Sequence, residues 1–123
     1  MRRGGVVRWG RRAYGVLVVL LLFVALVPQA DAPLGTPNDK VNHILAFLTL
    51  AIAARLLWPA AHPLVLFLWL ALFGGLIEVL QDVMGLGRDG DWVDFVADVG
   101  AIVVGLALAS AWLRFDQRRR SDI

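Results

Sequence analysis

The sequence predicts an all-α integral membrane protein, a four-helix bundle with both termini in the cytoplasm. Three observations lead to this prediction: 59% of the 123 residues are hydrophobic, they are concentrated in four long runs, and arginines flank these runs at the two chain ends. Soluble domains contain about 45–50% apolar residues, so the excess in these runs is typical of membrane proteins. The chain has no cysteine, which excludes disulfides and cysteine nucleophiles.

Each apolar run approaches the roughly 20 residues that a helix needs to cross about 30 Å of hydrocarbon. Strands are excluded because backbone groups in lipid must be hydrogen-bonded within the segment. We therefore expect one transmembrane domain between a basic cytoplasmic N-terminal segment and a basic cytoplasmic C-terminal segment. The N-terminal segment covers residues 1–12 and the C-terminal segment covers residues 114–123. The transmembrane domain covers residues 13–113, with helices expected at 13–28, 41–58, 64–84 and 92–113.

The first run has a second interpretation as a signal peptide. Arg2 and Arg3, a short apolar run and the small residues at 30–32 resemble a cleavable leader. Pro33 would hinder cleavage, and Arg11 and Arg12 flank the run as they would flank an anchor. We expect the helix to be retained; cleavage would leave three helices in the same orientation.

Orientation follows from the lysines and arginines of the short loops. Nearly all the basic residues lie at the two chain ends, whereas the two opposite loops carry only Lys40 and Arg88 against four aspartates. Both ends are therefore expected in the cytoplasm. The same placement argues against nucleic-acid binding, although the net charge is +2.

Polar residues interrupt the apolar runs at one depth of the predicted membrane. His43, Glu78 and Asp98 lie within the second, third and fourth runs. Because consecutive helices run in opposite directions, all three fall in the outer third of the membrane, where an isolated ionisable group costs a few kcal/mol. We expect them to face one another in a water-accessible pocket. The candidate ligand-binding residues are Asp39, Lys40, His43, Glu78, Gln81, Arg88, Asp94 and Asp98.

Several of these residues also have purely structural interpretations. Asp39 and Asp94 are suited to cap the N-termini of the second and fourth helices. Gln81 is suited to hydrogen-bond between helices, and His43 is suited to a structural donor role. These alternatives stay open at the level of sequence.

Small residues predict close helix contacts. Gly74 and Gly75 on the third helix, and Gly100 and Gly105 on the fourth, are expected at helix–helix interfaces.

One histidine and several carboxylates are residue types that bind a hard cation, but no HExxH-type spacing is present. The sequence therefore assigns no metal site and no cofactor, leaves open whether a cation binds the acidic cluster, and leaves the catalytic residues unknown.

The order of the polar residues resembles the VanZ-like family over residues 36–110. The resemblance rests on Asp39-Lys40 followed by His43, then Glu78 with Gln81, then Arg88, Asp94 and a glycine-rich last helix. Members are small multi-helix membrane proteins, and the founding member is associated with low-level resistance to the glycopeptide teicoplanin. Two positions depart from the family pattern, because Asp98 stands where asparagine is usual and Asp91 where serine is common.

The resemblance implies a multi-pass protein of the bacterial cytoplasmic membrane that binds a lipid-linked or cell-wall precursor ligand at its outer face, with a link to glycopeptide resistance. Two alternatives are a membrane-embedded enzyme acting on a lipid head group and a proton- or ion-coupled carrier. The sequence favours a role other than catalysis. Apart from the lipid bilayer and this ligand it indicates no partner, and it leaves the oligomeric state unknown.

Overall fold

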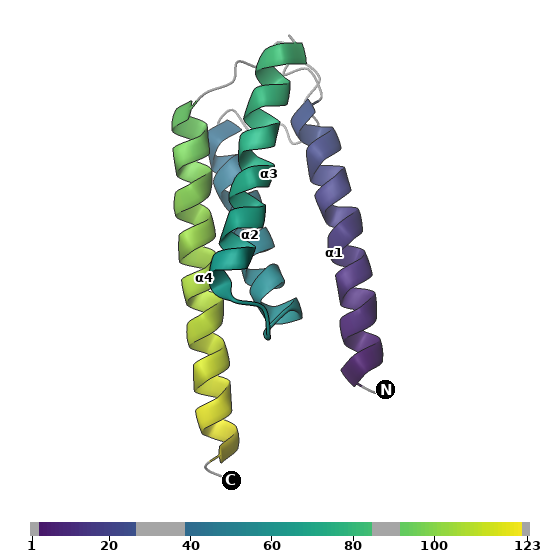
Figure 1. Cartoon of the computed structure of the whole chain (residues 1–123), viewed down its shortest axis with the longest axis vertical. Coiled ribbons are helices and arrows are strands. Elements are labelled where there is room, and N and C mark those ends of the chain that lie inside the picture. Colours follow the sequence, from purple (N-terminus) through teal and green to yellow (C-terminus); the bar gives the residue numbers. More distant parts are fainter. Residues whose placement is uncertain (1–2, 27–38, 85–91, 122–123) are drawn as a thin grey trace.

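The structure is a computed structural model that describes residues 3–26, 39–84 and 92–121. Nearly all of these residues are in helices. No strand occurs among these residues, which confirms the all-α prediction and the number of helices. Figure 1 shows them standing side by side along one axis, with the start of the first helix and the end of the last at the same end. The helices are α1 Arg3–Leu26, α2 Asp39–Leu57, α3 Pro63–Met84 and α4 Trp92–Ser121.

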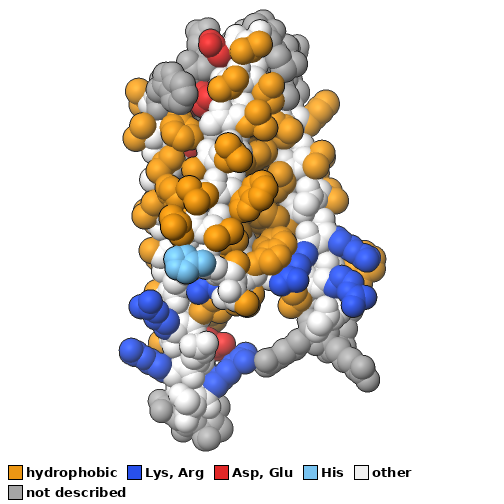
Figure 2. Space-filling model, in the orientation of Figure 1, with side chains coloured by type: hydrophobic (Ala, Val, Ile, Leu, Met, Phe, Trp, Pro, Cys, Tyr) orange, Lys and Arg blue, Asp and Glu red, His pale blue; other side chains and the backbone are white. Residues whose placement is uncertain are grey.

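Two helices are long and apolar enough to cross a membrane, over Pro63–Val83 and Val93–Ser121, when only the described residues are considered. A shorter apolar stretch covers His43–Leu57 in α2. In Figure 2 apolar side chains cover the middle of the visible face, while lysine and arginine side chains gather toward the end that holds the termini. This distribution agrees with the charge asymmetry of the sequence.

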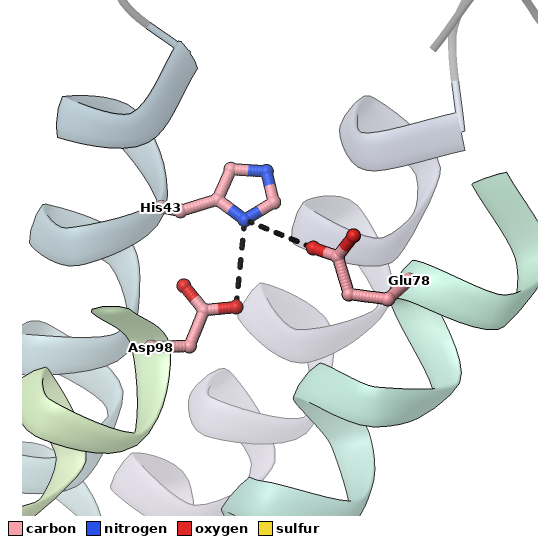
Figure 3. A group of neighbouring side chains, drawn as sticks. All are labelled: His43, Glu78 and Asp98. Atoms are coloured by element: carbon pink, nitrogen blue, oxygen red, sulfur yellow. Dashed lines mark ion pairs between the residues drawn. The ribbon is translucent and has the colours of Figure 1, made fainter. Parts of the chain in front are cut away.

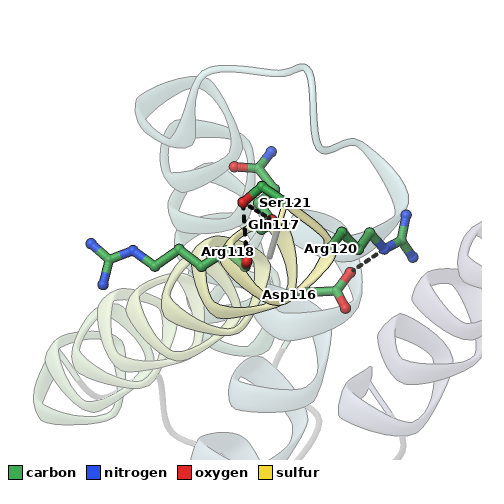
Figure 4. Close-up of polar contacts among 5 residues, drawn as sticks. All are labelled: Asp116, Gln117, Arg118, Arg120 and Ser121. Carbon is green, nitrogen blue, oxygen red and sulfur yellow. Dashed lines mark hydrogen bonds and ion pairs between the residues drawn. The ribbon is translucent and has the colours of Figure 1, made fainter. Parts of the chain in front are cut away.

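Two helices are longer than the apolar runs. α1 begins at Arg3 rather than at residue 13, and α4 ends at Ser121 rather than at residue 113. The extra residues of α4 contain no proline or glycine, and arginine and glutamine are good helix formers. Arg120 Nε lies 3.2 Å from Asp116 Oδ2, one turn back along the helix (Figure 4). Three arginines in the last turn also interact favourably with the negative end of the helix dipole.

The N-terminal extension of α1 is held against the end of α2. Arg11 Nε donates a hydrogen bond to the carbonyl oxygen of Leu57 over 3.1 Å. The same guanidinium lies 5.1 Å from the centre of the Trp58 ring, within the range of a cation–π interaction. The basic segment is therefore helical, and Arg11 joins it to the last carbonyl of α2 and to the Trp58 ring just beyond.

α2 and α4 make the most extensive contact in the bundle. Gly105 permits it, because a Cβ atom at this position would lie 2.7 Å from Ala51 Cβ and 2.9 Å from the carbonyl oxygen of Leu48. Gly75 similarly faces Phe95. The expectation that Gly100 shares the α4 interface is not met, since a Cβ there would meet nothing within 4 Å. Positions five apart point about 140° apart on a helix, so Gly100 and Gly105 cannot share one face.

α1 packs on α2 and α3. The Tyr14 hydroxyl donates a hydrogen bond to the carbonyl oxygen of Leu50 over 3.0 Å, and the Tyr14 and Trp58 rings meet edge-on. Beside this contact lies an apolar groove of about 440 Å³ that opens between α1, α2 and α3. Its lining includes Val18, Trp69 and Phe73. The fully buried core comes from α2, α3 and α4, and α1 packs half-buried side chains such as Leu17 and Leu21 against it.

We predict that Gly105→Val lowers the free energy of unfolding by about 1–3 kcal/mol, because the new side chain overlaps α2. Denaturation of the purified chain in mixed detergent micelles, followed by circular dichroism, measures this change. Gly100→Val is the matched control, since it makes the same replacement on α4 in open space. Equal stability of the two variants would contradict the α2–α4 packing.

Candidate functional site

Three polar side chains meet at one end of the bundle because of the way their helices run. His43 lies near the start of α2, Glu78 near the end of α3, and Asp98 near the start of α4. α3 runs opposite to both α2 and α4 (Figure 1), so these positions reach the same level. This level is toward the end opposite to the termini, as the depth argument from the sequence predicts.

Both carboxylates face the Nδ1 edge of the His43 imidazole (Figure 3). Its Nδ1 atom lies 3.5 Å from Asp98 Oδ2 and 4.0 Å from Glu78 Oε1. Hydrogen bonds between nitrogen and oxygen have lengths of about 2.7–3.2 Å, so both separations are ion-pair distances. We call His43, Glu78 and Asp98 the acid–imidazole centre.

The acid–imidazole centre is buried. The exposed fraction is 0% for Asp98, 3% for Glu78 and 7% for His43. Phe47, one turn along α2 from the histidine, and Ile102, one turn along α4 from the aspartate, are also buried. Removing charged groups from water costs several kcal/mol per ion unless they are paired, so their grouping in one place is the arrangement that burial demands.

Gly74 makes room for this centre. It lies one turn before Glu78 on α3, and a Cβ atom there would lie 3.6 Å from Asp98 Oδ2 and 3.3 Å from Phe47 Cζ. The sequence predicts Gly74 as a packing residue, and the structure adds that the helix surface it leaves open faces a carboxylate. A Cβ atom here would contact the carboxylate at an ordinary van der Waals distance and would press only on the end of the Phe47 ring.

The other predicted site residues have different positions. Gln81 is 2% exposed and lies on α3 one turn beyond Glu78, while Asp94 lies in the first turn of α4, one turn before Asp98. Both make further interactions within the molecule, as do all three members of the acid–imidazole centre. The side chains of Asp39 and Lys40, and the whole of Arg88, lie outside the described residues.

A second polar contact lies nearer to the end of the bundle that holds the termini. Arg55 Nε on α2 donates a hydrogen bond to Ser110 Oγ on α4 over 3.0 Å, and Arg55 Nη1 donates another to the carbonyl oxygen of Pro59 over 2.7 Å. From the sequence alone we expect Arg55 to extend toward the cytoplasmic interface. The feature of the sequence that indicates the Arg55–Ser110 contact is that α2 and α4 each carry one polar residue at this depth of the bundle.

Apolar packing separates the two polar levels. Leu50, Ala51 and Ile102 have 0% exposure, and Ala54 has 3%. These residues belong to the core that joins α2 and α4. Among the described residues of this interface, nothing polar bridges the acid–imidazole centre and the Arg55–Ser110 pair.

The centre offers three metal-ligand types. One ligand atom from each of His43, Glu78 and Asp98 can be chosen so that all three lie within 4.8 Å of one another. No local spacing motif encodes this set, because each ligand comes from a different helix, although the shared depth of the three residues predicted that they would face one another. No family model, curated protein or solved structure matches this chain, so the arrangement of its own side chains has to carry the functional argument.

We predict that His43 and Asp98 are energetically coupled. In a double-mutant cycle of His43→Gln and Asp98→Asn, the second substitution should cost less stability once the first is present, with a coupling energy on the order of 1 kcal/mol. Denaturation in mixed micelles provides the four stabilities. Asp116→Asn is the control partner, since it lies about 27 Å farther along α4. Additive effects of His43→Gln and Asp98→Asn would contradict the contact.

Proposed function

We propose that the chain is a multi-pass protein of the bacterial cytoplasmic membrane, with four membrane-spanning helices and both termini in the cytoplasm. The positive-inside rule supports this orientation. The arginines of the described helices lie toward the end with the termini, which would be the cytoplasmic end: Arg8, Arg11, Arg12, Arg55, Arg114, Arg118, Arg119 and Arg120. The centre of the apolar surface then lies in lipid, and the acid–imidazole centre lies toward the outer face.

We propose further that the protein binds a lipid-linked or cell-wall-related ligand at this outer end. The observation that carries the proposal is the acid–imidazole centre itself. Ionisable residues inside a membrane protein are costly and are usually functional, and three of them meet here within one buried cluster. Two carboxylates and an imidazole recognise the ammonium and hydroxyl groups that wall components and lipid head groups carry.

The resemblance to the VanZ-like family agrees with this proposal. His43, Glu78 and Asp98 stand at polar positions of the family pattern, and they come together in space. The link to glycopeptide resistance remains an expectation from the resemblance. It would follow if the bound compound belonged to the wall pathway on which glycopeptides act.

Transport is disfavoured by the packing beneath the centre. A proton- or ion-coupled carrier needs polar groups through the depth of the membrane, whereas Leu50, Ala51 and Ile102 form a buried apolar layer on the inner side of the centre. A second candidate is a membrane-embedded enzyme acting on a lipid head group. It is favoured by the position of the imidazole beside two carboxylates, an arrangement suited to general acid–base catalysis.

We predict that the chain, purified from membranes in mild detergent, retains a specific lipid-linked or wall-derived compound, and that Glu78→Gln loses most of it. Mass spectrometry of the co-purified lipids and small molecules provides the measurement. The reason is that Glu78 supplies one of the two carboxylates that would hold the polar group. A chemically altered head group that accumulates only with the unmodified chain would favour the enzyme.

Asp82→Asn is the control for this experiment. It removes a carboxylate from the same helix, four residues from Glu78, at an exposed position. Identical bound compounds in all three proteins would contradict ligand binding at the centre. Recovery of the folded chain from the soluble fraction would contradict the membrane placement.

A further inference from the structure

All three side chains of the acid–imidazole centre are of types that bind metal ions. With both carboxylates ionised and the imidazole neutral, the three side chains carry a charge of −2. One divalent cation carries the matching charge and leaves the imidazole in the neutral form that binds metals.

The spacing of the ligand atoms suits such a cation. Two ligands bound tetrahedrally to one ion at about 2.1 Å lie about 3.4 Å apart. Nδ1 of His43 lies 3.5 Å from Asp98 Oδ2 and 4.0 Å from Glu78 Oε1, and one atom from each residue fits within 4.8 Å of the others. These separations are wider than hydrogen bonds and need only small side-chain movements to become those of a metal site.

Figure 3 shows how the fold would hold the ion. His43, Glu78 and Asp98 come from α2, α3 and α4 and point toward one common space. Each lies within a helix rather than on a loop, and each is at least nine-tenths buried. Ligands on packed helices keep their geometry without the entropic cost of ordering a loop, which is favourable for metal binding.

We propose that His43, Glu78 and Asp98 bind one divalent transition-metal cation of the zinc or manganese class. One imidazole with two carboxylates suits these ions better than magnesium or calcium, which prefer oxygen ligands throughout. The inference rests on the proposed function, because it concerns the same centre. It also changes the group that the centre would contact: an ion with three protein ligands keeps a further position open, which would receive a phosphate or carboxylate oxygen of the bound compound in place of an ammonium or hydroxyl group.

The test is direct measurement of metal in the full chain. The protein is purified in mild detergent with a tag that contains no histidine, freed of metal with a chelator, and titrated with Zn²⁺, Mn²⁺ and Mg²⁺ by calorimetry. Elemental analysis of the protein before chelation gives the native content. We expect about one transition-metal ion per chain and weak or absent binding of Mg²⁺.

Variants assign the ion to the centre. His43→Ala and Asp98→Asn should each weaken Zn²⁺ or Mn²⁺ binding by at least about tenfold, since loss of even an indirect ligand contact has effects of this size. Asp82→Asn and His62→Ala are the controls, because both residues are exposed and lie outside the centre. Helical circular dichroism reports whether each variant folds. Added Zn²⁺ should raise the thermal stability of the unmodified chain and of the controls, but not that of His43→Ala.

The outcomes separate this inference from the proposed function. If the folded, unmodified chain binds none of the three ions, or if His43→Ala binds them as tightly as the unmodified chain, the metal site is wrong. If the co-purified compound is then still lost in Glu78→Gln, ligand binding stands without a metal. If the ion binds and no compound is retained, the metal site stands and ligand binding fails.

Discussion

The cost of isolating a charge in an apolar environment governs this structure. Glu78 and Asp98 lie on different helices, in segments otherwise rich in leucine, valine and alanine, and neither is exposed enough for water to solvate its carboxylate. The bundle meets this constraint by bringing both to His43 at one level. The contact of these three side chains, together with apolar packing, fixes the relative positions of α2, α3 and α4.

Small residues make the meeting geometrically possible. Gly105 lets the backbones of α2 and α4 approach through Ala51, and Gly74 leaves space for Asp98 and Phe47. Below this level the apolar layer around Leu50 and Ile102 closes the interface, and the Arg55–Ser110 pair lies on its other side. The molecule is thus polarised, with the acid–imidazole centre toward one end and arginines toward the other. This polarity underlies both the proposed orientation and the preference for binding over transport.

Sequence predicted the helices well because hydrophobic run length is a strong signal, and it predicted the common depth of His43, Glu78 and Asp98 because antiparallel helices fix depth by residue count. It placed the starts and ends of α1 and α4 less well, since a basic segment with good helix formers continues a helix without being apolar. The rotation of each helix about its own axis, which sets the direction in which its side chains point, could not be predicted from the length of the apolar runs. It directed Gly105 toward α2 and Gly100 away, and it brought together three ligand types that no local motif encodes.

The most direct test of the central claim uses the fact that the chain has only two histidines. Nuclear magnetic resonance of histidine-labelled protein in nanodiscs resolves the imidazoles of His43 and His62, with His62 in the turn between α2 and α3 as an internal reference. If the two carboxylates face His43, Asp98→Asn and Glu78→Gln should each shift its ring resonances and leave those of His62 unchanged. Resonances of His43 that do not respond to either substitution would contradict the account.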